Sequence, residues 1–201
     1  MQKPKTICLL DCHYRGEPRP SNQHADAEVS IGRQWNARLQ SLLAGHGIGA
    51  VRISTDELRP DSLRASMLAK RDMVLGLPEP PSMIIESHAN AIQVASAHGL
   101  VVEGWRDLPE SVRLSSMIAE AWREATRYRI STVLFPGAVG WLQSRLFHLF
   151  AEQRLPFVLI EIGNLYNDNI RIDLQNEGEF FSKLLEATVS AIVSWNEGES
   201  K

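Results

Sequence analysis

Three short, mainly apolar runs constrain the fold of this chain most strongly. They cover residues 6–11, 83–87 and 157–162. None shows the regular apolar–polar alternation of a strand that has one face in water, so each is typical of a strand covered on both faces. Helix-like segments separate the three runs. This order predicts an α/β fold whose sheet is largely parallel.

The remaining segments fit the same plan. Residues 50–54 and 99–105 are further expected strands, and apolar residues at helical spacing predict helices over 25–45, 60–75, 111–126, 140–153 and 180–195. We therefore expect a single three-layer domain over residues 1–201, with its core at about 6–195. A mostly parallel central sheet would have helices on both faces.

Composition and charge exclude several classes of protein. Apolar residues make up 44% of the chain, too many for a disordered protein. A net charge of −3 argues against nucleic acid as a partner. No apolar run approaches the roughly 20 residues that span a bilayer. Residues 6–10 are too short for a signal peptide, so we expect synthesis in the cytoplasm without a recognisable export signal.

The two cysteines are expected to be reduced. Cys8 and Cys12 fall in one predicted strand, which places their Cα atoms about 13 Å apart, too far for a disulfide. We interpret both as thiols of the core.

Polar side chains gather where the three apolar runs end. His13 follows the first run, His88 the second, and Glu161 lies in the third, while Glu28 falls in the first turn of the helix 25–45. The carboxyl ends of parallel strands meet at one edge of a sheet, where loops converge. Two imidazoles and one carboxylate form a usual ligand set of catalytic zinc, with a position left open for water. A further carboxylate can act as general base.

The order of these motifs resembles the zinc-dependent N-acetylmuramoyl-L-alanine amidases of type 3, found in bacterial cell-wall hydrolases and phage endolysins. That family begins with an apolar strand ending in Asp-x-Gly-His, followed by a Glu at the start of a helix. It continues with a strand ending in Ser-x-His-x-Asn-Ala, a strand beginning with Gly, and an apolar strand with Glu and then Asn or Asp. The matching segments are Leu10-Asp11-Cys12-His13, Ala27-Glu28-Val29, Ile84-Ile85-Glu86-Ser87-His88-Ala89-Asn90-Ala91, Gly99-Leu100-Val101-Val102-Glu103, Val158-Leu159-Ile160-Glu161-Ile162-Gly163-Asn164 and Asn167-Asp168.

The resemblance implies a site and a reaction. His13, Glu28 and His88 would bind Zn²⁺, and Glu161 would be the general base that later protonates the leaving amine. The substrate would be peptidoglycan or a muropeptide, cut at the amide between N-acetylmuramic acid and L-alanine. An endolysin-like protein of this kind would act at the cell wall, here without a separate wall-binding domain.

Several assignments have alternatives. Cys12 replaces the family's Gly before His13 and could compete as a thiolate ligand, and Asp26 is the rival carboxylate to Glu28. Glu86 shares a strand face with His88, so it could orient that ligand or form a salt bridge at the rim of the site. Other candidates for the pocket or for substrate contacts are Asn90, Arg15, Arg19, Asn22, Trp105 and Trp141.

Two other functions are compatible with the same residues. One is a zinc amidohydrolase or carboxypeptidase that acts on a small soluble acyl-amino acid. The other is an inactive module that only binds peptidoglycan. The presence of Glu161 argues against the second, because a binding module needs no general base.

Overall fold

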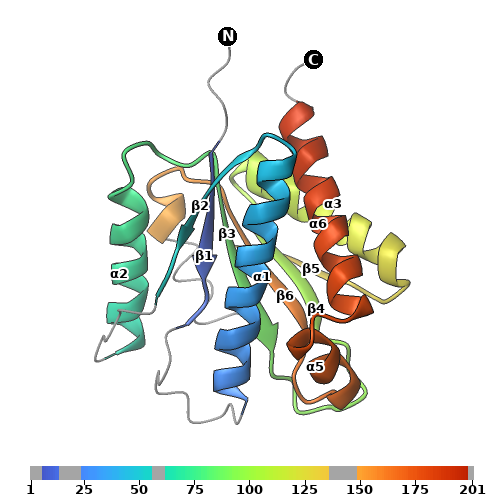
Figure 1. Cartoon of the computed structure of the whole chain (residues 1–201). Helices are drawn as coiled ribbons and strands as arrows, with labels where there is room; N and C mark the ends of the chain where they lie inside the picture. Colours follow the sequence, from blue (N-terminus) through green and yellow to red (C-terminus); the bar gives the residue numbers. More distant parts are fainter. Residues whose placement is uncertain (1–5, 14–23, 56–61, 136–148, 199–201) are drawn as a thin grey trace.

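A mixed six-stranded sheet organises the molecule. The computed structural model describes residues 6–13, 24–55, 62–135 and 149–198, and the strands in them are ordered β2-β1-β3-β6-β4-β5 (Figure 1). Strands β1, β2, β3 and β6 are parallel, whereas β4 is antiparallel to β6 and parallel to β5. The strand bounds are β1 (Thr6–Asp11), β2 (Gly49–Ile53), β3 (Met83–Asn90), β4 (Leu100–Trp105), β5 (Ser131–Phe135) and β6 (Phe157–Asn164). The prediction of a mostly parallel sheet is confirmed.

The three apolar runs form the middle of the sheet. They become β1, β3 and β6, which are direct neighbours. All eight residues of β6 are buried, because both of its faces are covered and both of its edges are paired. Continuous burial of this kind is the reason why these strands lack an apolar–polar alternation.

Helices cover both faces of the sheet, which confirms the three-layer prediction. Side chains of α1 (Ala25–Gly45), α3 (Pro109–Thr126) and α6 (Glu179–Glu197) share the larger core with one face of the sheet. The other face packs in a second core with α2 (Leu63–Leu75) and with Phe150. In the larger core the rings of Trp35 and Phe181 meet edge to face, with centroids 5.3 Å apart.

Some predicted elements changed and two were missed. Strand β5 and helix α5 (Asp168–Gln175) were not predicted, and β4 is the strand that pairs antiparallel with β6. Most of the predicted helix 140–153, and the start of the helix 60–75, lie outside the described residues. Both cysteines are buried thiols that are not part of a disulfide, as expected. In the described part of the chain, no helix is both long and apolar enough to cross a membrane.

A close approach between α1 and β3 positions the carboxyl edge of the sheet. A Cβ atom at Gly32 would lie 2.9 Å from the Ser87 carbonyl oxygen and 3.2 Å from Cys12 Sγ. Only glycine therefore allows α1 to lie this close to the sheet. Glu28 is one helical turn before Gly32, so the same contact brings its carboxylate to the ends of β1 and β3.

A buried network of hydrogen bonds also connects α1 to the strands. The Asn36 amide donates to Asp11 Oδ1 at 2.9 Å and to the Leu10 carbonyl at 3.1 Å, and it accepts from Ser87 Oγ at 2.8 Å. Arg52 of β2 forms a two-point ion pair with Asp11, at 3.1 and 2.9 Å. Three strands and α1 are thus connected beneath the edge at which the candidate site lies.

Candidate metal centre

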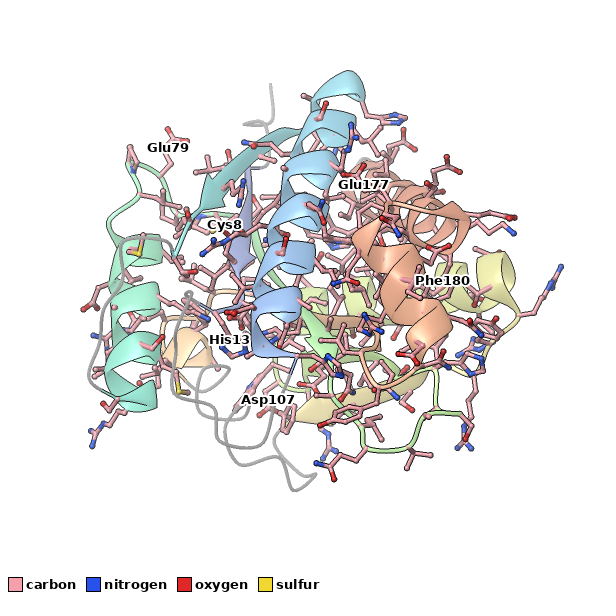
Figure 2. The ribbon with its side chains drawn as sticks, turned by 60° about the horizontal axis from the view of Figure 1, so that its bottom comes forward. Cys8, His13, Glu79, Asp107, Glu177 and Phe180 are labelled. Carbon is pink, nitrogen blue, oxygen red and sulfur yellow. The ribbon has the colours of Figure 1, made fainter. Side chains whose placement is uncertain are left out.

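The fold brings three of the predicted ligands together. Glu28 Oε1 lies 3.3 Å from His13 Nε2 and 3.1 Å from His88 Nδ1. The two imidazole rings meet edge to face, with centroids 4.8 Å apart. In Figure 2 His13 lies beside the first turn of α1, at the carboxyl edge of the sheet. These residues come from the end of β1, the start of α1 and the end of β3.

The spacing of these atoms fits a metal ion. An ion with tetrahedral bonds of about 2.0–2.1 Å holds its nitrogen and oxygen ligands about 3.3 Å apart, close to both separations from Glu28. Cys12 Sγ belongs to the same group, since one donor atom each from Cys12, His13, Glu28 and His88 lie within 4.8 Å of one another. Imidazole, carboxylate and thiolate donors suit several transition metals. This cluster could therefore bind a metal.

The electrostatics of the cluster favour positive charge. Burial alone would raise the pKa of Glu28, but the hydrogen bonds with His13 and His88 outweigh it and hold this pKa far below its ordinary value. Burial alone would lower the pKa of His88, yet the charge of Glu86 and the hydrogen bond with Glu28 raise it to about 10. A buried site that stabilises a protonated imidazole also stabilises a metal cation bound in place of the proton.

Glu161 lies beside this cluster on the next strand. In the register of β3 and β6 it is the direct partner of His88. Its side chain is buried, and its Oε2 atom makes no hydrogen bond within the described part of the chain. Burial raises the pKa of Glu161 to about 8, against the opposing charge of His88, and the carboxylates of Glu28, Glu103 and Glu86 add to the rise. A carboxyl group of this kind can hold and release a proton near neutral pH.

Two further charged residues at the site were not predicted. Lys70 of α2 is buried and its ammonium lies 2.5 Å from Glu86 Oε1. Glu103 of β4 is also buried, and burial raises its pKa to about 7. The available signal for Lys70 was its place on the apolar stripe of its helix, with Met67 and Val74, where a lysine is unusual.

Glu86 lies within the sheet rather than at the rim. Its side chain is 1% exposed and lies between Lys70 and His88, whose Nε2 atom is 3.5 Å from Glu86 Oε1. Both alternatives left open by the sequence thus describe the same carboxylate: it contacts a predicted ligand, and it forms an ion pair with a lysine.

The other sequence candidates lie in different places. Asp26 is exposed, two residues from the buried Glu28, so it is not part of the cluster. Asn90 ends β3, where the register with β6 shifts, and its carbonyl accepts from the Leu165 amide at 2.8 Å. The proposal that Trp105 stacks on substrate is wrong, because this ring is buried in the second core. The candidates outside the described residues are Arg15, Arg19, Asn22 and Trp141.

The asparagine after Glu161 organises the neighbouring loop. Asn164 is fully buried, accepts from the Ile92 amide at 3.0 Å, and donates to the Val94 and Ala97 carbonyls at 3.0 and 3.1 Å. It therefore fixes the segment that leaves β3 just beyond His88. Asn167 caps α5, since its side chain accepts from the Ile170 amide at 3.3 Å.

The fold of this chain is similar to that of several solved amidase structures. No protein-family model matches the chain, and no curated protein matches its sequence. Solved structures do match. The CwlD amidase of Clostridioides difficile, solved in complex with the GerS lipoprotein, has a TM-score of 0.75 at 21% identity, over 95% of this chain and 98% of that one.

Two further structures agree. The catalytic domain of CwlV, an N-acetylmuramoyl-L-alanine amidase from Bacillus (Paenibacillus) polymyxa var. colistinus, matches with a TM-score of 0.67 at 15% identity, over 94% of this chain and 97% of that one. The catalytic domain of the CD27L endolysin, which targets Clostridia difficile, has a TM-score of 0.66 at 15% identity, covering 96% of this chain and 97% of the other. The chain has the fold of N-acetylmuramoyl-L-alanine amidases over nearly its whole length.

Proposed function

We propose that this protein is a zinc-dependent amidase that hydrolyses the bond between N-acetylmuramic acid and L-alanine in peptidoglycan. One observation carries the proposal: Glu28 lies within 3.3 Å of two imidazoles at the carboxyl edge of the sheet, and Glu161 is the strand partner of one of them. The amidase fold supports the choice of substrate, since the matching proteins are named for this bond or as endolysins.

We assign the zinc to His13, Glu28 and His88. Two imidazoles and a carboxylate are a common ligand set for catalytic zinc, and three protein ligands leave a position for water or substrate. Cys12, whose thiol is near the same atoms, would close that position if it also became a ligand. We therefore assign Cys12 to the floor of the site and the three other residues to the metal.

The chemistry divides between the metal and Glu161. Zinc, when bound, polarises the scissile carbonyl and lowers the pKa of water. Glu161 accepts the proton of the attacking water at its carboxylate and then returns it to the nitrogen of the departing L-alanine. Burial of this carboxyl favours its protonated form, which is the form that donates in the second step.

Purified sacculi provide the test. Incubation with the zinc-loaded protein should release new L-alanine amino termini, and a chelator or the substitution Glu161→Ala should stop the release. The Glu161→Ala protein should still hold about one zinc per chain, since Glu161 is not among the assigned ligands. Sacculi that stay intact while small acyl-amino acids are cleaved would instead identify an amidohydrolase with a soluble substrate.

A further inference from the structure

Lys70 occupies an unusual position for a lysine. It is 4% exposed, in the middle of α2, and shares its helix face with Met67 and Val74 of the second core. Lysine is rarely buried unless its ammonium is paired. Here the ammonium has two acceptors, the Cys12 carbonyl oxygen and, at 2.5 Å, Glu86 Oε1.

The first acceptor is the carbonyl of the residue that precedes His13. Cys12 follows β1, at the point where the chain leaves the sheet and presents the imidazole of His13. The hydrogen bond from Lys70 to this carbonyl restricts the backbone conformation just before His13. The hydroxyl of Thr55 donates to the next carbonyl, that of His13, at 2.6 Å. The backbone on both sides of His13 Cα is thus held by side chains from distant parts of the chain, Lys70 and Thr55.

The second acceptor connects Lys70 to His88. Glu86 Oε1, which accepts from Lys70, is 3.5 Å from His88 Nε2, while the other ring nitrogen faces Glu28 at 3.1 Å. A separation of 3.5 Å is longer than a well-formed hydrogen bond, and a shift of about half an ångström would close it. A carboxylate on the far nitrogen of a metal-binding imidazole fixes the ring orientation and the position of its proton.

We propose that Lys70 is a positioning residue for the metal centre, acting on His13 through the Cys12 carbonyl and on His88 through Glu86. This inference rests on the proposed function, because it takes both imidazoles as zinc ligands. Two of the three N–H donors of the ammonium are directed to these acceptors, the Cys12 carbonyl and Glu86. Its charge compensates that of Glu86, so a full carboxylate can remain buried behind His88 without an unpaired charge in the core.

This arrangement gives α2 a role in the site although it contributes no ligand. Met67 and Val74 anchor the helix in the second core on either side of Lys70. The ammonium therefore reaches Cys12 and Glu86 from a rigid base, across the face of the sheet opposite to α1. His13 follows β1, and His88 belongs to the neighbouring strand β3. The Lys70 ammonium thus helps to hold both of these ligands.

Two measurements test the proposal. The first is zinc affinity, determined by competition with a chelating dye, and the second is the thermal unfolding temperature of the metal-free protein. Lys70→Met should weaken zinc binding about 10- to 100-fold, the range for residues that support metal ligands. The double variant Lys70→Met/Glu86→Met replaces the ion pair by apolar side chains of similar size, a change that proteins often tolerate. It should unfold near the wild-type temperature but still bind zinc at least tenfold more weakly. Lys183→Met, which removes a lysine from an exposed ion pair, is the control and should change neither quantity.

The outcomes separate the two proposals. Wild-type zinc affinity in the double variant would overturn the inference, because a merely structural ion pair would then account for Lys70. Unchanged affinity in Lys70→Met would overturn it as well. If the wild-type protein itself bound no zinc, that result would contradict the proposed function rather than the role of Lys70 alone. Weak zinc binding in a stably folded double variant would support the role given to Lys70.

Discussion

Replacing Glu161 by glutamine should make the metal-free protein more stable at alkaline pH. Glu161 is 7% exposed, and its Oε2 atom has no hydrogen-bond partner among the described residues. Burial is the largest cause of its raised pKa, and the carboxylates of Glu28, Glu103 and Glu86 add to it. Glutamine has nearly the same shape and never carries the charge. The substitution therefore removes the penalty of a buried carboxylate and leaves the packing of β6 in place.

The sign and size of the effect follow from the pKa of about 8 in the folded protein and an ordinary value of 4.5. Below 4.5 the carboxyl is protonated in both the folded and the unfolded chain, so it makes no difference to stability. Between 4.5 and 8 the unfolded chain loses this proton while the folded protein keeps it, and stability falls as the pH rises. Above 8 the full penalty is present. The difference between the two pKa values corresponds to at most about 5 kcal/mol.

Chemical denaturation of the metal-free proteins across a pH series measures this directly. Glu161→Gln and wild type should have equal free energies of unfolding near pH 4, and the variant should gain progressively up to about pH 9. Glu124→Gln, an exposed change on α3, is the matched control and should show no such trend. A variant that is equally or less stable than wild type at about pH 9 would refute the reasoning, since Glu161 would then be a well-solvated or hydrogen-bonded carboxylate. The same substitution should abolish hydrolysis, and a gain in stability with a loss of activity is characteristic of a functional group.

Further changes test separate parts of the structure. His13→Ala should remove stoichiometric zinc, measured by metal analysis, while Cys12→Ala should retain it; loss of zinc from the latter would make the thiol a ligand. Cobalt substitution of the wild type should accordingly show no thiolate charge-transfer band in the near ultraviolet. Gly99→Ala should destabilise the fold by about 1–3 kcal/mol in denaturant titrations, because φ is 71° there and a Cβ would lie 2.7 Å from Asn164 Cβ. Gly45→Ala, where a Cβ meets nothing within 4 Å, is its control and should be neutral or stabilise by up to about 1 kcal/mol.

The sequence predicted the central part of the fold because burial on both faces leaves a clear pattern. Strands β1, β3 and β6 are apolar along most of their length, and their order along the chain, separated by helices, indicated a parallel arrangement. Strand β5 lies at the edge of the sheet and only its last residue is buried, so its sequence, Ser131–Phe135, carries no such run. The direction of β4 could not be predicted for a different reason. Apolar content reports burial, and a strand is equally apolar whichever way it runs between its neighbours.

Some residues of the candidate site could likewise be predicted from the sequence, and others could not. Residues that lie at the end of a strand or in the first turn of a helix could be grouped from the sequence, since the fold class brings those positions to one edge: His13, Glu28, His88 and Glu161. Lys70 and Glu103 could not, because Lys70 lies in the middle of α2 and Glu103 lies on β4, whose place beside β6 the sequence did not predict. Whether such a residue faces the site depends on the rotation of a helix or the register of a strand. Those quantities are set by packing with distant parts of the chain.

The position of the centre between two helical layers has a consequence for its rigidity. On one side of the sheet, Asn36 of α1 holds the end of β1 through Asp11 and the Leu10 carbonyl, and it also binds Ser87 of β3. On the other side, Lys70 contacts the carbonyl of Cys12, the residue after β1, and the side chain of Glu86 in β3. Glu86 and Ser87 are successive residues of β3, so their side chains point to opposite faces, Glu86 toward Lys70 and Ser87 toward Asn36. Loosening the core on either face should therefore lower metal affinity before the protein unfolds, because it removes contacts that position these residues while the sheet itself remains paired.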